Sequence, residues 1–254
     1  MGKGAIGLAA VAAMIGTPVL AADMAVKAPP PLPPPVYSWT GFYAGAEIGG
    51  GWASQQTTIV TQSSATPAFP VGAVLNPINM SGVLGGLYAG YNYQVDHVVF
   101  GIDGDYTWAN LSGTGSDISP IPGNGDVSNH WDRMNWVSTV TGRLGYANNN
   151  WLFFAKGGWA WAGFDGFTTT SSPAGVLLNS STTSSTRNGW TVGGGGEWGF
   201  AAHWSAKLEY DYVGFNTSTT AITETSAATG AVTFPIRSTT SHLNMVKAGV
   251  AYRF

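Results

Sequence analysis

The last stretch of the chain, residues 246–254, constrains the fold most, because its even and odd positions carry different kinds of side chain. The even positions are apolar: Val246, Ala248, Val250, Tyr252 and Phe254. The odd positions hold Lys247, Gly249, Ala251 and Arg253. Side chains of a strand alternate between its two faces, whereas a helix would scatter these charges around its circumference. The stretch is therefore predicted to be a strand that pairs with the first strand and closes the sheet into a barrel.

Composition indicates that this barrel lies in a membrane. Charged residues make up 9 % of the chain, whereas a soluble domain carries about 25 %. After the N-terminus, no apolar run reaches the roughly 20 residues that a membrane helix needs. A transmembrane β-barrel instead spreads its apolar residues over alternate positions. A secreted β-sandwich rich in Gly, Ser and Thr is the alternative, and the strand pattern favours the barrel over it.

Charge balance and cysteine content narrow the possibilities further. The net charge is −3 and no segment concentrates Lys or Arg, so nucleic acid is not expected as a partner. The chain contains no cysteine, so no disulfide can hold the fold in an oxidising compartment. The hydrogen bonds of the closed sheet must hold it instead.

The N-terminal segment has the features of an export signal. Residues 1–21 are predicted to be a secretory signal peptide, with Lys3 as its positive end, an apolar stretch at 5–20 and small residues at 19–21 for cleavage. Cleavage after Ala22 is the alternative to cleavage after Ala21. A membrane anchor helix is disfavoured by the Gly-Thr-Pro sequence at 16–18. Residues 22–36 are rich in proline and are predicted to be an extended periplasmic spacer rather than a ligand for another domain.

Eight strand-like segments follow, and each is long enough to cross a membrane at a tilt. They are residues 40–52, 82–95, 98–111, 134–146, 151–164, 188–200, 203–215 and 246–254. The connections after the second, fourth and sixth segments are short, and the others reach roughly twenty residues or more, as in outer-membrane barrels. Residues 37–254 are therefore predicted to form an all-β, eight-stranded antiparallel up-and-down transmembrane barrel, with short periplasmic turns and long extracellular loops.

Charged residues in the middle of these strands all fall on the side opposite the aromatic residues. They are Glu47, Asp103, Asp105, Arg143, Lys156, Glu197, Lys207, Glu209, Asp211, Lys247 and Arg253. An Arg or Lys facing lipid near the midplane would cost about 2–4 kcal/mol. These residues are therefore predicted to form a network of ion pairs in the lumen. Eight strands leave an interior that side chains fill, so a water channel would need the room left by inward glycines.

Catalytic and ligand-binding sites are not predicted in this chain. The carboxylate pairs Asp103 with Asp105 and Glu209 with Asp211 could serve acid–base or metal chemistry, but lumen ion pairs are the preferred interpretation. Residues 193–196 are four glycines inside a strand, which indicates space for a bulky lumen neighbour rather than a phosphate loop. No catalytic, cofactor or metal residue is therefore assigned.

The four histidines have no metal-ligand spacing. His130 and His242 should lie near the outer rim, where they could meet haem or a metal. Solvated loop residues are the preferred interpretation for both.

Two stretches resemble one known family. Residues 37–45, Tyr-Ser-Trp-Thr-Gly-Phe-Tyr-Ala-Gly after a proline-rich segment, and the ending 246–254 resemble the small outer-membrane immunogenic, porin-like proteins of alphaproteobacteria. Residues 103–106 and 208–212 are similar to the family's third and seventh strands. The resemblance implies an OmpA-like barrel in the bacterial outer membrane, with Tyr252 and Phe254 as the signal for the barrel-assembly machinery. It also implies roles in envelope integrity and surface antigenicity, with haem binding or pore formation in some members, and no catalytic residues.

Three functional hypotheses follow from these observations. The leading one is a non-catalytic structural and surface-antigen protein that contacts outer-membrane lipid and lipopolysaccharide. The first alternative is a narrow porin-type diffusion channel. The second is a receptor or adhesin that binds an extracellular ligand or host surface through long loops such as residues 168–186.

Overall fold

The computed structural model describes residues 37–61, 72, 74, 76–118, 125–221, 224–225, 232–233 and 236–254. The predicted signal peptide (1–21) and proline-rich spacer (22–36) lie outside this part of the chain and stay predictions. In the described residues, no helix is long and apolar enough to span a membrane.

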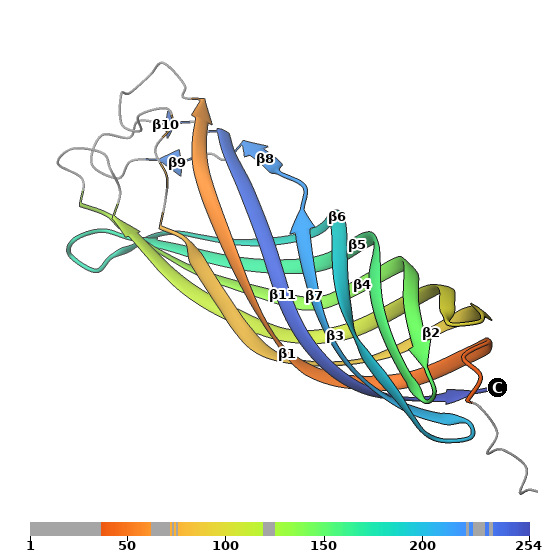
Figure 1. Ribbon diagram of the computed structural model, residues 1–254. Helices are drawn as coiled ribbons and strands as arrows, with labels where there is room; N and C mark the ends of the chain where they lie inside the picture. The colour runs from red at the N-terminus through yellow and green to blue at the C-terminus, as the bar shows by residue number, and fades with distance from the viewer. Residues whose placement is uncertain are drawn as a thin grey trace, which may run out of the picture. The chain divides into compact units, whose positions relative to one another are not determined.

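Eight strands form a closed antiparallel ring (Figure 1). They are β1 (Gly41–Thr61), β2 (Ile78–Val95), β3 (Val98–Ile118), β4 (Val127–Asn148), β5 (Trp151–Ser171), β6 (Leu177–Ala201), β7 (Trp204–Phe215) and β11 (Ile236–Arg253). Pairing of β1 with β11, from Tyr43↔Arg253 outward, closes the ring. The short β8 (Ser218–Ala221) adds to the outer end of β11, and β9 (Glu224–Thr225) pairs with β10 (Val232–Thr233). The predicted fold class, including the strand count and the pairing of first and last strands, is confirmed.

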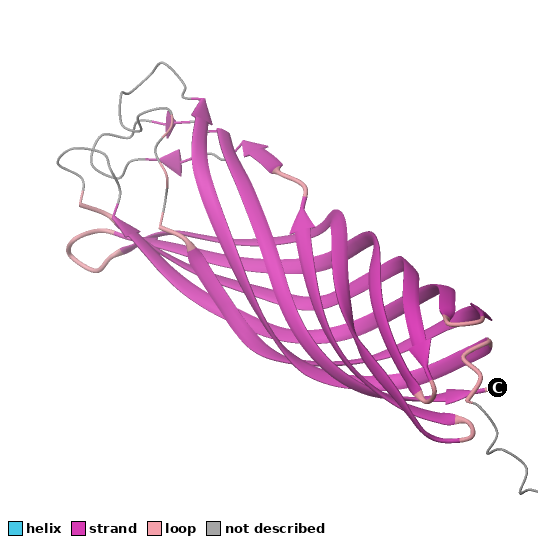
Figure 2. Cartoon of the chain, viewed as in Figure 1, coloured by secondary structure: helices cyan, strands magenta, loops and turns pink. Residues whose placement is uncertain are grey.

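Tight turns join the strands at the end of the barrel where β1 begins and β11 ends (Figure 2). They lie between β2 and β3, between β4 and β5 and between β6 and β7. Asp96 and Asn149 adopt φ angles of 51° and 54° in two of these turns. Asp and Asn enter the left-handed region more readily than other non-glycine residues, so these positions suit a tight reversal. The short turns agree with those expected from the sequence.

At the opposite end the strands run further than predicted. β4 begins at Val127 rather than at 134, and β6 begins at Leu177 rather than at 188. Only residues 172–176 separate β5 from β6. The prediction of a long loop at residues 168–186 is therefore wrong, because most of this segment is a β-hairpin. Its Ser and Thr residues continue the backbone ladder without an apolar face, so periodicity could not show the strands.

A β-bulge interrupts the regular pairing of β4. Trp108 pairs with Trp136 and Leu111 with Met134, while on the other side Met134 pairs with Phe164 and Trp136 with Gly163. Against β5 the extra residue is Asn135, which shifts the phase of the strand, so Met134 is buried as Val137 is. A strand without the bulge would turn Met134 toward the outside.

Two girdles of aromatic residues mark the outer wall of the barrel. Near the tight turns, the rings of Phe42 and Tyr91 lie 4.8 Å apart and those of Trp151 and Trp198 6.1 Å apart. The second girdle, called the upper girdle below, lies on the side away from the tight turns. It includes the stacked pair Tyr106 and Trp136, the pair Trp190 and Tyr212, and Trp52.

The height between the girdles fits a membrane. From Phe42 to Trp52 the strand rises roughly 33 Å at about 3.3 Å per residue. At a strand tilt of about 40° this becomes roughly 25 Å, the height of the apolar band in outer-membrane barrels. Exposed aliphatic side chains occupy the wall between, among them Ile48, Leu87, Ile102, Leu144 and Leu208. This part of the barrel therefore spans the membrane.

Candidate functional site

The lumen holds the chemistry-bearing side chains of the membrane-spanning wall. The structure places all of the predicted lumen charges inside the barrel, each at most 6 % exposed. Alternation of the strands explains this placement, because each charge occupies an inward position between outward apolar neighbours. They separate into a lysine–carboxylate cluster and an arginine–glutamate cluster.

Lys247 is the centre of the lysine–carboxylate cluster. Its side chain has no solvent exposure. Its Nζ lies 3.0 Å from Glu47 Oε1, 2.9 Å from Glu209 Oε1, 3.0 Å from Asp211 Oδ2 and 3.4 Å from Asp105 Oδ2. These carboxylates come from β1, β3 and β7. One ammonium group therefore ties three strands to β11 across the lumen.

Two further lysines complete this cluster. Lys156 Nζ lies 3.0 Å from Glu209 Oε1 and 3.3 Å from Asp211 Oδ2, with Asp103 and Asp105 within 4 Å. Lys207 Nζ lies 2.9 Å from Glu47 Oε2 and 3.2 Å from Glu209 Oε2. Lys207 also stands 3.5 Å above the centre of the Tyr88 ring, a favourable cation–π position. The carboxylates thus share the lysines rather than forming isolated pairs.

The arginine–glutamate cluster lies closer to the tight turns. Arg143 Nη2 is 2.5 Å from Glu197 Oε2, and Arg253 Nη2 is 3.4 Å from Glu197 Oε1. Ser205 donates a hydrogen bond to Glu197 at 2.6 Å. The Tyr43 hydroxyl donates to Asp103 Oδ2 at 2.6 Å and accepts from Arg143 at 3.5 Å, so it joins the two clusters.

Opposite charges nearly balance across the two clusters. The lysine–carboxylate cluster has two more carboxylates than lysines, and the arginine–glutamate cluster has one more cation than carboxylates. Buried charges are tolerated only when such partners and hydrogen bonds replace water. Each charge of the network therefore has an oppositely charged partner inside the protein.

An apolar plug closes the lumen on the outer side of the network. Inward side chains of seven of the ring strands, all except β6, form one buried cluster: Ala53, Met80, Leu84, Ala109, Leu111, Met134, Val137, Ala160, Ala162, Phe164, Val213, Phe215, Leu243 and Met245. On the other side of the network, Trp39, Val99, Ala147 and Leu152 form a second buried layer. The charged layer is thus enclosed between two apolar layers.

Two inward glycines lie against large lumen side chains. A Cβ built on Gly45 would lie 2.7 Å from the Tyr88 ring, so that ring already fills the space beside the glycine. At Gly193 the Asp211 carboxylate occupies the corresponding space, in keeping with the expectation of a bulky lumen neighbour at residues 193–196. The glycines accommodate large neighbours rather than water.

A polar layer above the plug was missed by the sequence-based prediction. Gln55 Nε2 donates to Asp132 at 3.1 Å, and Arg187 donates to Ser241 at 2.7 Å and to Gln55 at 3.3 Å. These residues fall in segments that were predicted as loops. The available signal was the odd numbering that Gln55 shares with Glu47, Arg187 with Glu197 and Ser241 with Lys247. The sequence-based prediction also did not include Tyr43 among the lumen residues. Tyr43 lies in a predicted strand, and its odd number places it on the same face as Glu47.

His130 lies in β4 and His242 in β11, so the expectation that both are loop residues is wrong. His130 Nε2 is 3.5 Å from Asp117 Oδ2, and its Nδ1 is 3.1 Å from the Thr168 hydroxyl. His242 is exposed on the outer wall and stacks on Tyr212 at 6.1 Å. Within the described residues, no group of three or more His, Cys, Asp or Glu could hold a metal ion.

Comparison with known proteins adds family membership to this geometry. Residues 8–254 match the family described as "Outer membrane protein beta-barrel domain". The chain belongs to this family. The match extends over almost the whole chain, so the outer membrane is its location.

Relatives and solved structures agree with this assignment. The chain is 30 % identical over 211 residues to the 31 kDa outer-membrane immunogenic protein of Brucella melitensis, covering 81 % of this chain and 84 % of the relative. It is 27 % identical over 201 residues to the 25 kDa outer-membrane immunogenic protein of Brucella abortus, covering 76 % and 75 %. The resemblance to alphaproteobacterial immunogenic proteins is confirmed.

Among solved structures, the outer membrane protease OmpT of Escherichia coli is similar with a TM-score of 0.52. The similarity covers 86 % of this chain and 98 % of OmpT. Sequence identity is 9 %, so the likeness shows the fold alone.

Tyr252 and Phe254, the predicted assembly signal of this family member, lie on the outer wall beside the tight turns. Their rings meet edge to face at 5.2 Å, and Tyr252 contacts Trp204 in the same way at 5.2 Å. The Phe254 amide donates to the Phe42 carbonyl at 3.0 Å, which extends the closing ladder to the last residue. The Phe254 side chain is 75 % exposed, so a partner protein can reach it.

Proposed function

We propose that this outer-membrane barrel is a non-conducting structural protein of the envelope that presents β-hairpins as a surface antigen. The observation that carries the proposal is the enclosed lumen, where a self-paired ion network lies between two apolar layers. A diffusion pore lined by charge keeps those charges wet. Here Lys247, Leu111 and Met134 have no solvent exposure.

The cost of opening such an interior supports a closed state. An ion crossing the barrel would have to displace the plug and separate the lysines from their carboxylates. Removing one partner from a buried pair costs about 3–5 kcal/mol, and several pairs share each lysine. The relatives' designation as immunogenic proteins favours exposure at the cell surface. No catalytic step forms part of the proposal.

Planar-bilayer recording tests the closed state directly. Refolded protein is expected to give no stable conductance steps, because buried apolar layers lie on both sides of the ion network. A general porin reconstituted in the same bilayer is the positive control, and a heat-modifiable band in an unheated gel verifies folding of the sample. Stable, reproducible steps from the folded protein would favour the diffusion-channel alternative.

A receptor role is the second candidate, favoured by the β5–β6 hairpin that continues beyond the upper girdle. Replacing residues 169–180 by an Asn-Gly turn between the paired Thr168 and Ser181 removes the outer part of this hairpin. The barrel is expected to keep its resistance to heat and urea within about 1 kcal/mol, because the cut lies outside the plug. If the hairpin is a receptor, binding to a host surface is lost with it. Unchanged binding contradicts the receptor role, and a lost barrel shows that the hairpin supports the fold.

A further inference from the structure

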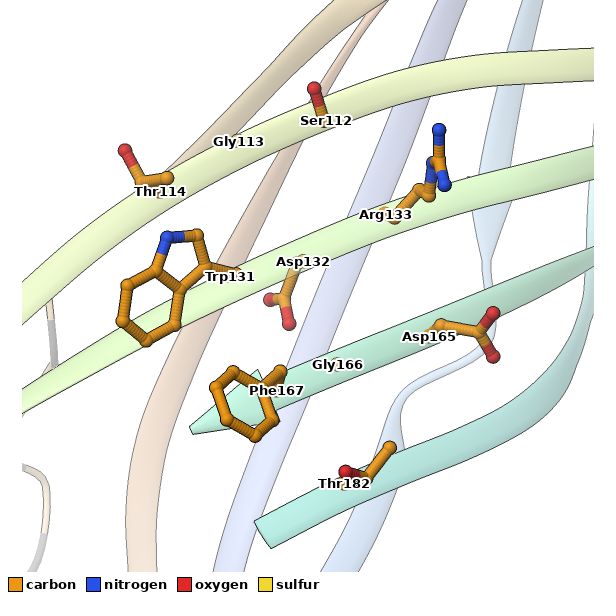
Figure 3. Close-up of a pocket in the computed structure, with 10 residues that line it drawn as sticks. All are labelled: Ser112, Gly113, Thr114, Trp131, Asp132, Arg133, Asp165, Gly166, Phe167 and Thr182. Carbon is orange, nitrogen blue, oxygen red and sulfur yellow. The ribbon is translucent and has the colours of Figure 1, made fainter. Parts of the chain in front are cut away.

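A groove opens on the wall of the barrel where β3, β4, β5 and β6 continue past the upper aromatic girdle. Its volume is about 530 Å³. Figure 3 shows Trp131 and Phe167 side by side, with Arg133 and Asp165 further along the same two strands. Thr114 and Thr182 line the groove on the flanking strands. The lumen network does not involve these residues, and the sequence pattern did not point to them.

Trp131 and Phe167 form the apolar floor of the groove. They are cross-strand partners on β4 and β5, with ring centres 5.6 Å apart and planes inclined by 37°. Both remain more than 40 % exposed. Two large rings left open side by side are costly in water, which marks a binding surface.

The height of the two rings separates them from the lipid-facing girdle. Along β4, Trp131 lies further from the tight turns than the girdle residue Trp136. At about 3.3 Å per residue and a strand tilt of about 40°, the rings lie roughly 12 Å above the girdle. Acyl chains end at the girdle, so they do not cover Trp131 and Phe167. In the outer leaflet of an outer membrane, this layer is occupied by the sugars of lipopolysaccharide.

Planar polar groups flank the aromatic floor. Arg133 donates from Nε and Nη2 to Asn110 Oδ1 at 3.2 and 2.6 Å, which uses two of its five N–H donors. Asp165, the cross-strand partner of Arg133, accepts a hydrogen bond from Asn135, the bulge residue of β4. The groove therefore offers one guanidinium and two carboxylates, Asp132 and Asp165, beside two aromatic faces.

This combination matches a sugar that carries an anionic substituent. A pyranose ring has an apolar C–H face that packs on aromatic rings and a rim of hydroxyls that bonds to planar polar groups. A guanidinium recognises phosphate or carboxylate with two parallel hydrogen bonds. Sugars next to the lipid anchor of lipopolysaccharide carry such anionic groups. The groove faces sideways, toward neighbouring molecules of the same leaflet.

We propose that this groove binds the membrane-proximal core sugars of a lipopolysaccharide molecule in the same leaflet. The aromatic floor packs on one sugar ring, Arg133 binds its anionic substituent and Asp165 accepts from its hydroxyls. The proposal names a partner for the envelope role and rests on the outer-membrane location, but it does not depend on a closed lumen. A conductance result that contradicts the proposed function would therefore leave this inference unaffected. A failure to bind lipopolysaccharide would likewise leave the proposed closed lumen unaffected.

The test uses the refolded full chain in phospholipid nanodiscs, with binding measured by titration. Three probes are compared: lipopolysaccharide with a complete core, lipid A without core sugars, and core oligosaccharide released from its lipid. Trp131→Ala combined with Phe167→Ala removes the floor, and Arg133→Gln removes the charge. Trp159→Ala is the matched control, since Trp159 is an exposed aromatic on the outer wall of β5. A heat-modifiable gel band verifies folding of each variant.

Wild-type protein is expected to bind the core-bearing lipopolysaccharide at least tenfold more tightly than lipid A, and to bind the released oligosaccharide measurably. The double floor variant should lose about tenfold or more for the core-bearing probe, Arg133→Gln several-fold, and Trp159→Ala less than twofold. Equal affinity for lipid A and core-bearing lipopolysaccharide overturns the proposal, as does an unchanged double variant. An equal loss in Trp159→Ala would show general contact of aromatic residues with lipid and also overturns it.

Discussion

Replacing Lys247 with methionine is expected to lower the free energy of unfolding by about 3–5 kcal/mol, the usual cost of removing one partner from a buried ion pair. Lys247 is fully buried and lies within 3.4 Å of Glu47, Asp105, Glu209 and Asp211. Methionine keeps the volume of the side chain but leaves these carboxylates facing one another with one ammonium fewer. Urea titration of the barrel in lipid vesicles, followed by tryptophan fluorescence and gel mobility, measures the loss.

Two companion variants separate the loss of the ion pairs from general damage. Arg133→Met removes an exposed cation and should change stability by no more than about 0.5 kcal/mol. Adding Asp211→Asn to Lys247→Met should restore part of the loss, since it removes one of the unpaired carboxylates. A loss below about 1 kcal/mol for Lys247→Met would contradict the network as described, and would mean that water or a solvent cation can replace the lysine.

Deleting Phe254 is expected to reduce the amount of assembled barrel in the outer membrane several-fold while changing the stability of the refolded protein little. The side chain is 75 % exposed and packs only at its edge on Tyr252, so few contacts are lost on its removal. The last strand must nevertheless be recognised before the ring closes. Quantitative blots of outer-membrane fractions, read beside urea titration of the purified protein, distinguish the two effects.

Phe200→Ala is the matched control for this deletion. Phe200 is an exposed aromatic residue in β6 near the same rim, but it lies away from the chain terminus. Its replacement should leave assembly near the wild-type level. Normal assembly without Phe254 would show that the barrel-assembly machinery reads another part of the last strand.

The membrane-spanning part of the fold could be predicted from the sequence because two environments act on each strand. A charged side chain is unfavourable on the lipid-facing side of a strand but is tolerated on the side that faces the lumen. The residue types at positions such as Lys247 and Tyr252 therefore indicate which side of the strand each occupies. The same constraint placed the charges of the lumen, which all lie inside. Pairing of β1 with β11 followed from the need to remove both edges.

The remaining features escaped prediction for identifiable reasons. Beyond the upper girdle both faces of the strands meet polar surroundings, so the period-two signal fades and β6 was predicted to start at 188 instead of Leu177. The bulge at Asn135 depends on pairing with two neighbouring strands, which no local pattern encodes. Trp131 and Phe167 are neighbours in the groove because of the register between β4 and β5, which cannot be read from the sequence.

The apolar plug has a consequence for how this protein can change over generations. It separates the ion network from the hairpins, so substitutions in the hairpins do not alter the energies that keep the ring closed. Under the proposed surface-antigen role, antibodies would select on the hairpins, whereas folding and insertion select on the part of the barrel below the plug. If the hairpins are the antigen, as proposed, they are expected to diversify while the membrane-spanning wall below the plug stays constant.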